Sequence, residues 1–206
     1  MGTYIDIHTH QPTLSHPAPE GAGVHPWDAQ KKTINEAELR SATLIGEIGL
    51  DYACTVDRAL QKDIFCRQLS LAQQYSKPVV LHCVRAFEDV MRCLSQYHLR
   101  AVIFHGFIGS RQQAEQAVKR GYFLSFGEGA FRSPRTLDAM RHIPLSHLFA
   151  ETDESPMPIE KIYEMIARER GIGISELQQQ IEENYNNIFL QYNEQYLVRA
   201  NNSTIR

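Results

Sequence analysis

The chain has 206 residues, a length that predicts one large domain rather than two small ones. Hydrophobic residues make up 43% and charged residues 22%, near the globular averages, which argues against a disordered, collagen-like or membrane-spanning chain. Lysine and arginine number 21 against 24 aspartate and glutamate residues, a net charge of −3, so any polyanionic ligand must be attracted by a local site.

The cysteines and the N-terminus indicate a cytoplasmic protein. Four cysteines are present, and none has the C-x-x-C spacing of a zinc ribbon or a thioredoxin-type pair. The first residues lack the basic region and the continuous apolar stretch of a signal peptide, and no apolar run approaches the ~20 residues that a spanning helix needs. We therefore expect free thiols, a cytoplasmic location and no membrane partner.

Short apolar runs alternate with longer segments whose apolar residues recur at helical spacing, as in repeated β/α units around a parallel sheet. Seven runs are predicted to be strands: 4–7, 22–24, 43–48, 79–81, 101–104, 122–126 and 147–150. Seven strands are one fewer than a complete (β/α)₈ barrel needs. The fold class is therefore α/β, and the expected architecture is a TIM-like (β/α) barrel that is seven-stranded or distorted through loss of one β/α unit.

Helical periodicity predicts four helices, at about 56–75, 90–97, 114–118 and 175–192. Ser175 lies three residues before Gln178, a capping-box pattern that indicates the start of the last helix. No Pro-rich or Gly/Ser-rich linker divides the sequence. We expect a single domain over residues 1–198 and a polar C-terminal tail over residues 199–206.

Ionisable side chains stand at the ends of five predicted strands. His8 and His10 are separated by one residue, so both imidazoles point to the same side of an extended segment, with roots roughly 7 Å apart. In an α/β barrel the carboxyl ends of all strands converge on one face, where active sites lie. Six potential ligands are therefore expected at one mouth: His8, His10, Glu47, His82, His105 and Asp153.

Four imidazoles and two carboxylates suit Zn²⁺, Mn²⁺ or Fe²⁺ and are too nitrogen-rich for Ca²⁺. Six ligands exceed the need of one tetrahedral zinc with an open position, so two ions that share a bridging carboxylate are expected. Two divalent ions and two carboxylates leave a net charge of about +2, which attracts phosphate to an otherwise acidic chain. Such a pair lowers the pKa of a bridging water and stabilises the leaving oxygen of an in-line displacement.

With these residues assembled, the chain resembles the TatD family of metal-dependent hydrolases, within the amidohydrolase-like barrel group. The matching segments run through almost the whole sequence and keep their order: 6–10, 23–26, 46–52, 61–65, 68–72, 77–82, 105–110 and 151–153. The predicted last helix, with Asn184 before Ile188 and Phe189, is similar to the family's C-terminal helix. The resemblance implies a metal-dependent deoxyribonuclease of the 3′ to 5′ exonuclease type.

The resemblance also implies how the ligands are shared. His8, His10 and Asp153 would hold one ion, His82 and His105 the other, and Glu47 would bridge them. Asp153 and Glu47 are the expected catalytic residues, with Asp153 as the general base, because a ligating carboxylate can accept a proton from bound water. The expected cofactors are two divalent ions of Zn, Mn, Mg or Fe, and the expected partner is DNA or a small phosphorylated substrate.

The sequence departs from the family pattern at three places. Only residues 11–22 separate the first two motifs, where family members usually have a longer stretch with a helix, a strand and another helix. After His82 the usual arginine stands one place further along, as Arg85, and Asp153 is followed by Glu154 and Ser155 before the proline. The last two changes fall where substrate would be gripped.

Three residues are candidate substrate contacts. His25 could face the substrate or support its strand end, and Asp51, expected in a loop over the mouth, could orient a ligand imidazole. Arg85 could grip a phosphate with its guanidinium or stand as an exposed residue at a helix start. Cys83 has the opposite strand parity from His82, so we expect it to point away from the ligands, with no nucleophilic role.

Two other functions stay open. A hydrolase of a small-molecule ester, amide or phosphoester could use the same metal site, because the sequence shows neither a basic stripe nor an aromatic stacking platform for nucleic acid. A catalytically silent metal-binding protein is the third alternative, although retention of every ligand argues against it.

Overall fold

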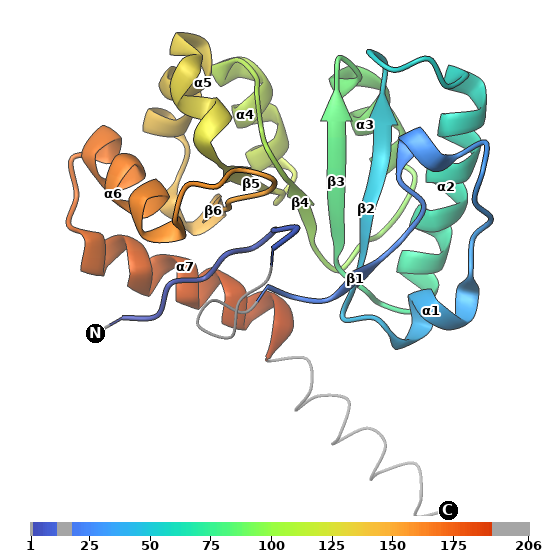
Figure 1. The fold of residues 1–206 in the computed structure, drawn as a ribbon, viewed down its shortest axis with the longest axis horizontal. Helices are drawn as coiled ribbons and strands as arrows, with labels where there is room; N and C mark the ends of the chain where they lie inside the picture. The colour runs from blue at the N-terminus through green and yellow to red at the C-terminus, as the bar shows by residue number, and fades with distance from the viewer. Residues whose placement is uncertain (1, 12–17, 191–206) are drawn as a thin grey trace, which may run out of the picture.

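The computed structural model describes residues 2–11 and 18–190 and has the α/β class expected. Six parallel strands form one sheet in chain order, and Figure 1 shows their arrangement. Among the described residues, six strands are paired in regular ladders, one fewer than the seven predicted. The strands are β1 (Gly21–Ala22), β2 (Leu44–Asp51), β3 (Val79–Val84), β4 (Val102–Phe104), β5 (Phe123–Phe126) and β6 (Leu148–Ala150).

The segment predicted as the first strand is extended but has no regular ladder. It lies beside β6 and its continuation, where Ile7 N donates to Ala150 O at 3.1 Å and His10 N donates to Asp153 O at 3.1 Å. The main chain of Ile5 instead bonds to a side chain, because the Tyr163 hydroxyl accepts from its N–H at 3.1 Å and donates to its carbonyl at 2.9 Å. A tyrosine therefore takes the place of part of a neighbouring strand.

A side chain also replaces the ladder at the other edge of the sheet. The second predicted strand, 22–24, is paired only over Gly21–Ala22. Beyond it, Gln68 accepts from Val24 N at 2.6 Å and donates to Val24 O at 3.1 Å. We call the gap between segment 5–10 and β1 the seam, and no ladder crosses it among the described residues. The seam is where the sequence predicts a missing β/α unit.

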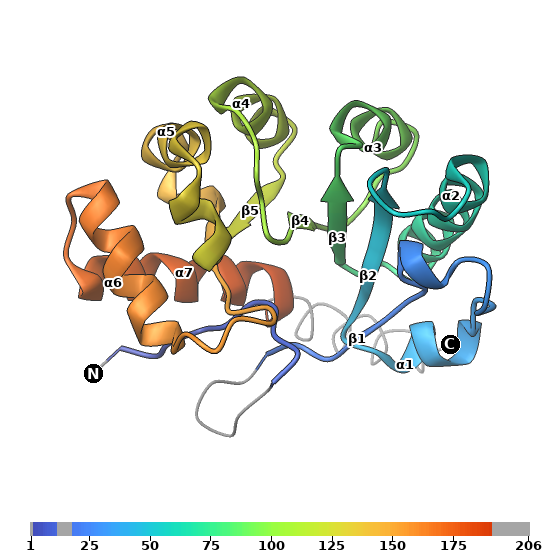
Figure 2. The same ribbon diagram turned by 45° about the horizontal axis from the view of Figure 1, so that its top comes forward.

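Helices surround the sheet. Figure 2 shows α2 to α6 in an arc outside the strands, while Asn184 of α7 donates to Leu145 O and Leu148 O at the amino end of β6. The helices are α1 (Glu36–Ser41), α2 (Arg58–Gln74), α3 (Phe87–Leu94), α4 (Arg111–Lys119), α5 (Pro134–His142), α6 (Ile159–Arg170) and α7 (Ile174–Phe189), with short 3₁₀ turns η1 (Pro26–Asp28), η2 (Glu128–Arg132) and η3 (Leu145–His147).

The helix predictions are confirmed in part. The helices expected near 56–75, 90–97 and 114–118 correspond to α2, α3 and α4, whereas α1, α5 and α6 were not expected. The capping box at Ser175 is wrong, because α7 begins at Ile174 and Gln178 is buried and donates to Gly2 O at 3.1 Å. The end of the last predicted helix and the 199–206 tail lie outside the described residues.

Apolar side chains on both faces of the parallel sheet are buried, as β/α units require. Ile45, Leu81 and Ile103 are fully buried in three successive strands. Among the described residues, no helix combines the length and apolar character needed to cross a lipid bilayer. All four cysteines are free thiols.

Candidate metal centre

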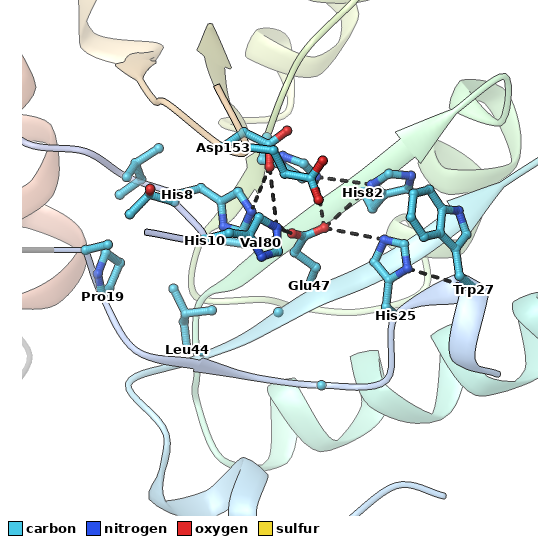
Figure 3. A pocket seen from close by; sticks show the side chains of 18 of the residues that line it. His8, His10, Pro19, His25, Trp27, Leu44, Glu47, Val80, His82 and Asp153 are labelled. Atoms are coloured by element: carbon cyan, nitrogen blue, oxygen red, sulfur yellow. Dashed lines mark hydrogen bonds and ion pairs between the residues drawn. The ribbon is translucent and has the colours of Figure 1, made fainter. Parts of the chain in front are cut away.

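Strand β2 carries the residue at the centre of the site. Glu47 does not end this strand, as predicted, but lies within it, because β2 continues to Asp51. The register between β2 and β3 shifts between Ile45 and Ile48, so Glu47 has no regular partner in the ladder at that point. Its carboxylate is instead surrounded by imidazoles (Figure 3). The same extension makes Asp51 a strand residue, which corrects its predicted place in a loop.

One group of donors gathers around Oε1 of Glu47. Nε2 of His8 lies 2.6 Å and Nε2 of His10 lies 3.2 Å from this oxygen. Asp153 Oδ1 lies 3.7 Å from His8 Nε2 and 3.4 Å from His10 Nε2. Atoms of all four side chains lie within 4.8 Å of one another, close enough to hold one ion.

A second group gathers around Oε2 of the same carboxylate. His105 Nε2 lies 3.2 Å, His25 Nε2 3.4 Å and His82 Nδ1 3.6 Å from this oxygen of Glu47. His25 was predicted as a substrate contact or a strand support, and the structure places it among potential ligands instead. Its Nδ1 accepts from the N–H of Trp27 at 3.3 Å and caps η1, which leaves Nε2 facing Glu47.

Asp51 lies behind His82, away from the cavity. Its Oδ2 lies 3.2 Å from His82 Nε2 and accepts from Trp27 Nε1 at 2.6 Å, and its Oδ1 accepts from Ala53 N at 2.7 Å. Asp51 is buried, so it contacts the imidazole rather than any substrate in the cavity. Of the two roles considered for it, the geometry matches orientation of a ligand. Trp27, to which the sequence assigned no role, supports this arrangement.

Glu151 is a second buried carboxylate that the sequence did not single out as a site residue. It directly follows β6, is fully buried, and its Oε1 accepts from Gly106 N at 2.6 Å and lies 3.6 Å from His105 Nδ1. The Nδ1 atom of His105 thus faces Glu151, and its Nε2 atom faces Glu47. Its signal in the sequence was the run of acidic residues 151, 153 and 154 after an apolar strand.

Asp6 connects the chain segment that carries His8 and His10 to the segment that carries Asp153. Its carboxylate accepts from Thr152 N at 3.0 Å and from the Thr152 hydroxyl at 2.6 Å. The same hydroxyl lies 2.9 Å from Thr9 Oγ1. These bonds hold residues 6–10 against the loop that positions Asp153, which itself adopts a positive φ of 55°.

The electrostatics of the site follow from burial opposed by close partners. Burial raises the pKa of Glu47, but the imidazoles of His105, His25, His8 and His82 close to its oxygens outweigh burial and hold that pKa far below its ordinary value. Burial lowers the pKa of His105, but the carboxylates of Glu151 and Glu47 raise it to about 10. The carboxylate at the centre is therefore ionised.

Burial has the larger effect on the pKa of two other carboxylates of this region, Asp153 and Asp6. It raises the pKa of Asp153 above its ordinary value, although the nearby imidazoles of His105 and His8 oppose it. Burial likewise raises the pKa of Asp6 to about 6, against the hydrogen bonds from Thr152.

The donor atoms fit divalent cations. His82 Nδ1 and His105 Nε2 face each other at 3.2 Å, while the other nitrogen of each ring faces a carboxylate, Asp51 or Glu151. When those outer nitrogens carry the protons, the two inner nitrogens present lone pairs to each other, an arrangement that a cation stabilises. The buried Nε2 of His8 likewise makes no hydrogen bond with a described residue although Glu47 lies beside it.

A cavity of about 490 Å³ opens onto these donors and continues along the seam. Ile7 and Gly21 line it on the two sides of the seam. Leu44 and Val80 also line it (Figure 3). Arg85 is not among its lining residues. The predicted substrate contact Arg85 is exposed and lines a separate cavity, so the structure does not bring it to the metal donors.

The comparisons with known proteins agree with the fold and point to one family. A model of the family described as "TatD related DNase" matches residues 18–190. The Escherichia coli K12 protein YjjV, an uncharacterized metal-dependent hydrolase, is 34% identical over 151 residues, 66% of this chain and 58% of YjjV. A TATDN1 homolog of Vairimorpha ceranae, provisionally named a deoxyribonuclease, is 30% identical over 145 residues, 69% of this chain and 54% of that protein.

A solved structure shares the architecture. The crystal structure of YjjV superposes with a TM-score of 0.76 at 26% identity, covering 86% of this chain and 78% of YjjV. The sequence match spans a little over half the length of the two relatives above. The family match covers most of the chain and includes every predicted ligand except His8 and His10, which precede it. This chain therefore belongs to the TatD family.

Proposed function

We propose that this protein is a metal-dependent phosphodiesterase that acts on DNA as a 3′ to 5′ exonuclease. The observation that carries the proposal is the pair of donor groups that share the two oxygens of Glu47. The family's description as TatD related DNase and the deoxyribonuclease name of a relative support the substrate class. The proposal assigns residues 1–198 to one hydrolase domain and the protein to the cytoplasm.

In this proposal two divalent ions are held at the centre, drawn from Zn, Mn, Mg or Fe. One ion is bound by His8, His10 and Asp153, and the other by His82 and His105, with Glu47 shared between them. His25 lies close enough to the second group to act as a further ligand or as a contact to phosphate. Such ions lower the pKa of water and neutralise charge on a phosphoryl group when bound.

The two catalytic carboxylates have different surroundings. The Glu47 side chain is 9% exposed and that of Asp153 is 39% exposed. Glu47 stays ionised and fixes the imidazoles around it. Asp153 has room at the cavity wall to accept a proton from the attacking water, as a general base requires.

A small-molecule hydrolase is the second candidate, and the shape of the cavity favours it. A volume of about 490 Å³ suits a compact ligand. Lys32 is the one lysine or arginine that lines this cavity among the described residues, so the cavity wall offers little attraction for a long polyanion. A catalytically silent protein is disfavoured by the complete donor set.

Hydrolysis assays on the metal-loaded protein test the proposal. Single-stranded DNA labelled at its 5′ end should yield a ladder that shortens with time, and mononucleotides should be the released product. Asp153→Asn should abolish this release, and Asp63→Asn on the outer face of α2 serves as the matched control. Turnover of small phosphoesters with intact DNA would establish the second candidate, and no turnover of either would overturn both.

A further inference from the structure

A second cavity, of about 740 Å³, adjoins the metal centre, and His105 lines both cavities. We call it the arginine cavity, after Arg85 and Arg135. The loop after β3 and the start of α3 form one side of it, and the loop after β4 with the first turn of α5 forms the other. Cys83 also lines it, and burial raises the pKa of this thiol to about 12, so the thiol stays protonated and offers no nucleophile there.

The floor of the arginine cavity is aromatic. Phe104 and Phe107 are buried at its base, and Phe87 packs against Phe104 with ring centroids 5.8 Å apart. Ile108 adds an aliphatic side chain that is 53% exposed, one of three large hydrophobic residues so exposed among the described residues. Such a surface favours a flat apolar ring over a hydrated chain.

Two arginines from different elements stand at the rim. Arg85 follows β3 with a φ of +54°, a left-handed conformation that is unfavourable for a non-glycine residue. Arg135 lies in the first turn of α5, where the helix dipole adds positive potential. Both are exposed, and neither makes an ion pair within the described part of the chain. Strain at an unpaired, exposed cation is typical of a functional position.

The carboxylates of the cavity do not cancel this charge. Asp89 accepts from the Tyr52 hydroxyl at 2.5 Å and pairs with Arg92, so its charge is already compensated. Glu88 is exposed in the first turn of α3. Two unpaired arginines thus face one free carboxylate, which leaves a net positive rim above an apolar floor.

We propose that the arginine cavity binds a nucleoside monophosphate unit, with its base on the apolar floor and its phosphate between Arg85 and Arg135. A guanidinium can grip two phosphate oxygens at once, and the volume accommodates a nucleotide. The inference rests on the proposed nuclease function, and because His105 separates the cavity from the metal centre, the bound unit is the neighbour of the phosphate to be cleaved.

Calorimetric titration of the metal-loaded, full-length protein with dAMP tests the proposal. Arg85→Ala and Arg135→Ala should each weaken dAMP binding at least tenfold, whereas Arg67→Ala, which removes an exposed arginine on α2, should leave it unchanged. Arg85→Gly relieves the left-handed backbone and keeps the test valid if the alanine variant folds poorly. Ile108→Ser should weaken dAMP more than inorganic phosphate.

Competing probes separate the possible occupants. Deoxyadenosine and inorganic phosphate should each bind at least tenfold more weakly than dAMP. The proposal would be overturned if inorganic phosphate or deoxyadenosine bound as tightly as dAMP. It would also be overturned if both arginine variants bound dAMP as tightly as the unchanged protein. Hydrolysis of bis(p-nitrophenyl) phosphate, measured in parallel, reports on the metal centre, so loss of that activity with intact dAMP binding would count against the proposed function and not against the cavity.

Discussion

The two halves of the metal centre rest on different kinds of support. Glu47, His82 and His105 come from β2, β3 and the end of β4, three neighbouring strands joined by parallel ladders. His8 and His10 come from a segment that is held against the continuation of β6 by a few main-chain hydrogen bonds. The half with Glu47, His82 and His105, which we call the ladder half, is a product of sheet formation. The half with His8 and His10, which we call the seam half, depends on local contacts.

On each side of the seam, a single side chain supplies hydrogen bonds that the neighbouring strand does not. Tyr163 bonds both main-chain groups of Ile5, and Gln68 bonds both main-chain groups of Val24. Buried backbone groups must be paired, and these two residues pair the main chain of Ile5 and Val24 where the main-chain hydrogen bonds to β6 and the ladder to β2 stop. The comparison teaches that side chains of the flanking helices can pair main-chain groups where a ladder is short.

Replacing Glu47 should have the largest effect, because its two oxygens belong to both halves. Glu47→Gln removes the negative charge that faces five imidazoles within 3.6 Å, and we expect phosphodiesterase activity to fall at least about a thousandfold. Metal analysis should show loss of bound ions. Glu176→Gln, at an exposed position of α7, is the matched control. A variant with full activity and metal content would contradict the shared role.

Tyr163→Phe should weaken the seam half while sparing the ladder half. The substitution keeps the ring, which meets Tyr4 edge-on, but leaves the N–H and carbonyl of Ile5 without partners, a cost of about 2 kcal/mol in the free energy of unfolding. Urea denaturation measures this loss. Tyr185→Phe, on a half-buried ring of α7, should change stability by much less.

Tyr163→Phe should also change the affinity for metal. If the seam half depends on Tyr163, one equivalent of metal should bind more weakly and the other should keep its affinity. Gln68→Leu is the corresponding variant on the β1 side, because Gln68 bonds the main chain of Val24 and not that of the segment that carries His8 and His10. Equal weakening of both metal equivalents by Tyr163→Phe would show that the halves are not independent.

Asp51→Asn should reduce metal affinity in the ladder half. Asp51 faces Nε2 of His82, and loss of such an outer carboxylate typically lowers metal affinity about 10- to 100-fold. Competition with a chromophoric chelator measures the change. Asp63→Asn is the control, and an unchanged affinity in the Asp51 variant would show that the carboxylate does not orient the imidazole.

Much of the ladder half could be predicted from the sequence, because apolar runs that end in a histidine define a strand and a ligand together. His105 directly follows β4, as predicted, whereas His82 lies within β3, which continues to Val84. Glu47 was placed correctly at the centre but not within its strand, since an irregular register leaves no mark in the hydrophobic pattern. The extent of β2 therefore needed the structure.

The seam half was less predictable for a physical reason. The hydrogen bonds from Tyr163 to Ile5 and from Gln68 to Val24 join residues 158 and 44 positions apart. Periodicity predicts the helix that carries Gln68 but not α6, which carries Tyr163, and it says nothing of what either side chain bonds. The buried carboxylate of Glu151 was also missed, because its role lies in a contact with His105 from another strand.

Trp27→Phe should have the smallest effect and tests how finely the ladder half is tuned. The phenyl ring keeps an aromatic group beside His25 and His82, whose rings lie 4.8 and 5.8 Å from the indole, but it removes the Nε1 donor to Asp51. Asp51 retains its bond from Ala53, so metal affinity should fall about two- to threefold, the factor of a net hydrogen bond of about 0.5 kcal/mol.

A second substitution at the same position is the control for Trp27→Phe. Trp27→Ala removes both the donor and the aromatic contacts and should weaken metal binding further, and because Trp27 is 54% exposed neither change should disturb the core. A loss in Trp27→Phe as large as that in Asp51→Asn would mean that the indole, rather than the backbone of the β2 loop, fixes the carboxylate behind His82. The ladder half would then depend on a single side chain, as the seam half does.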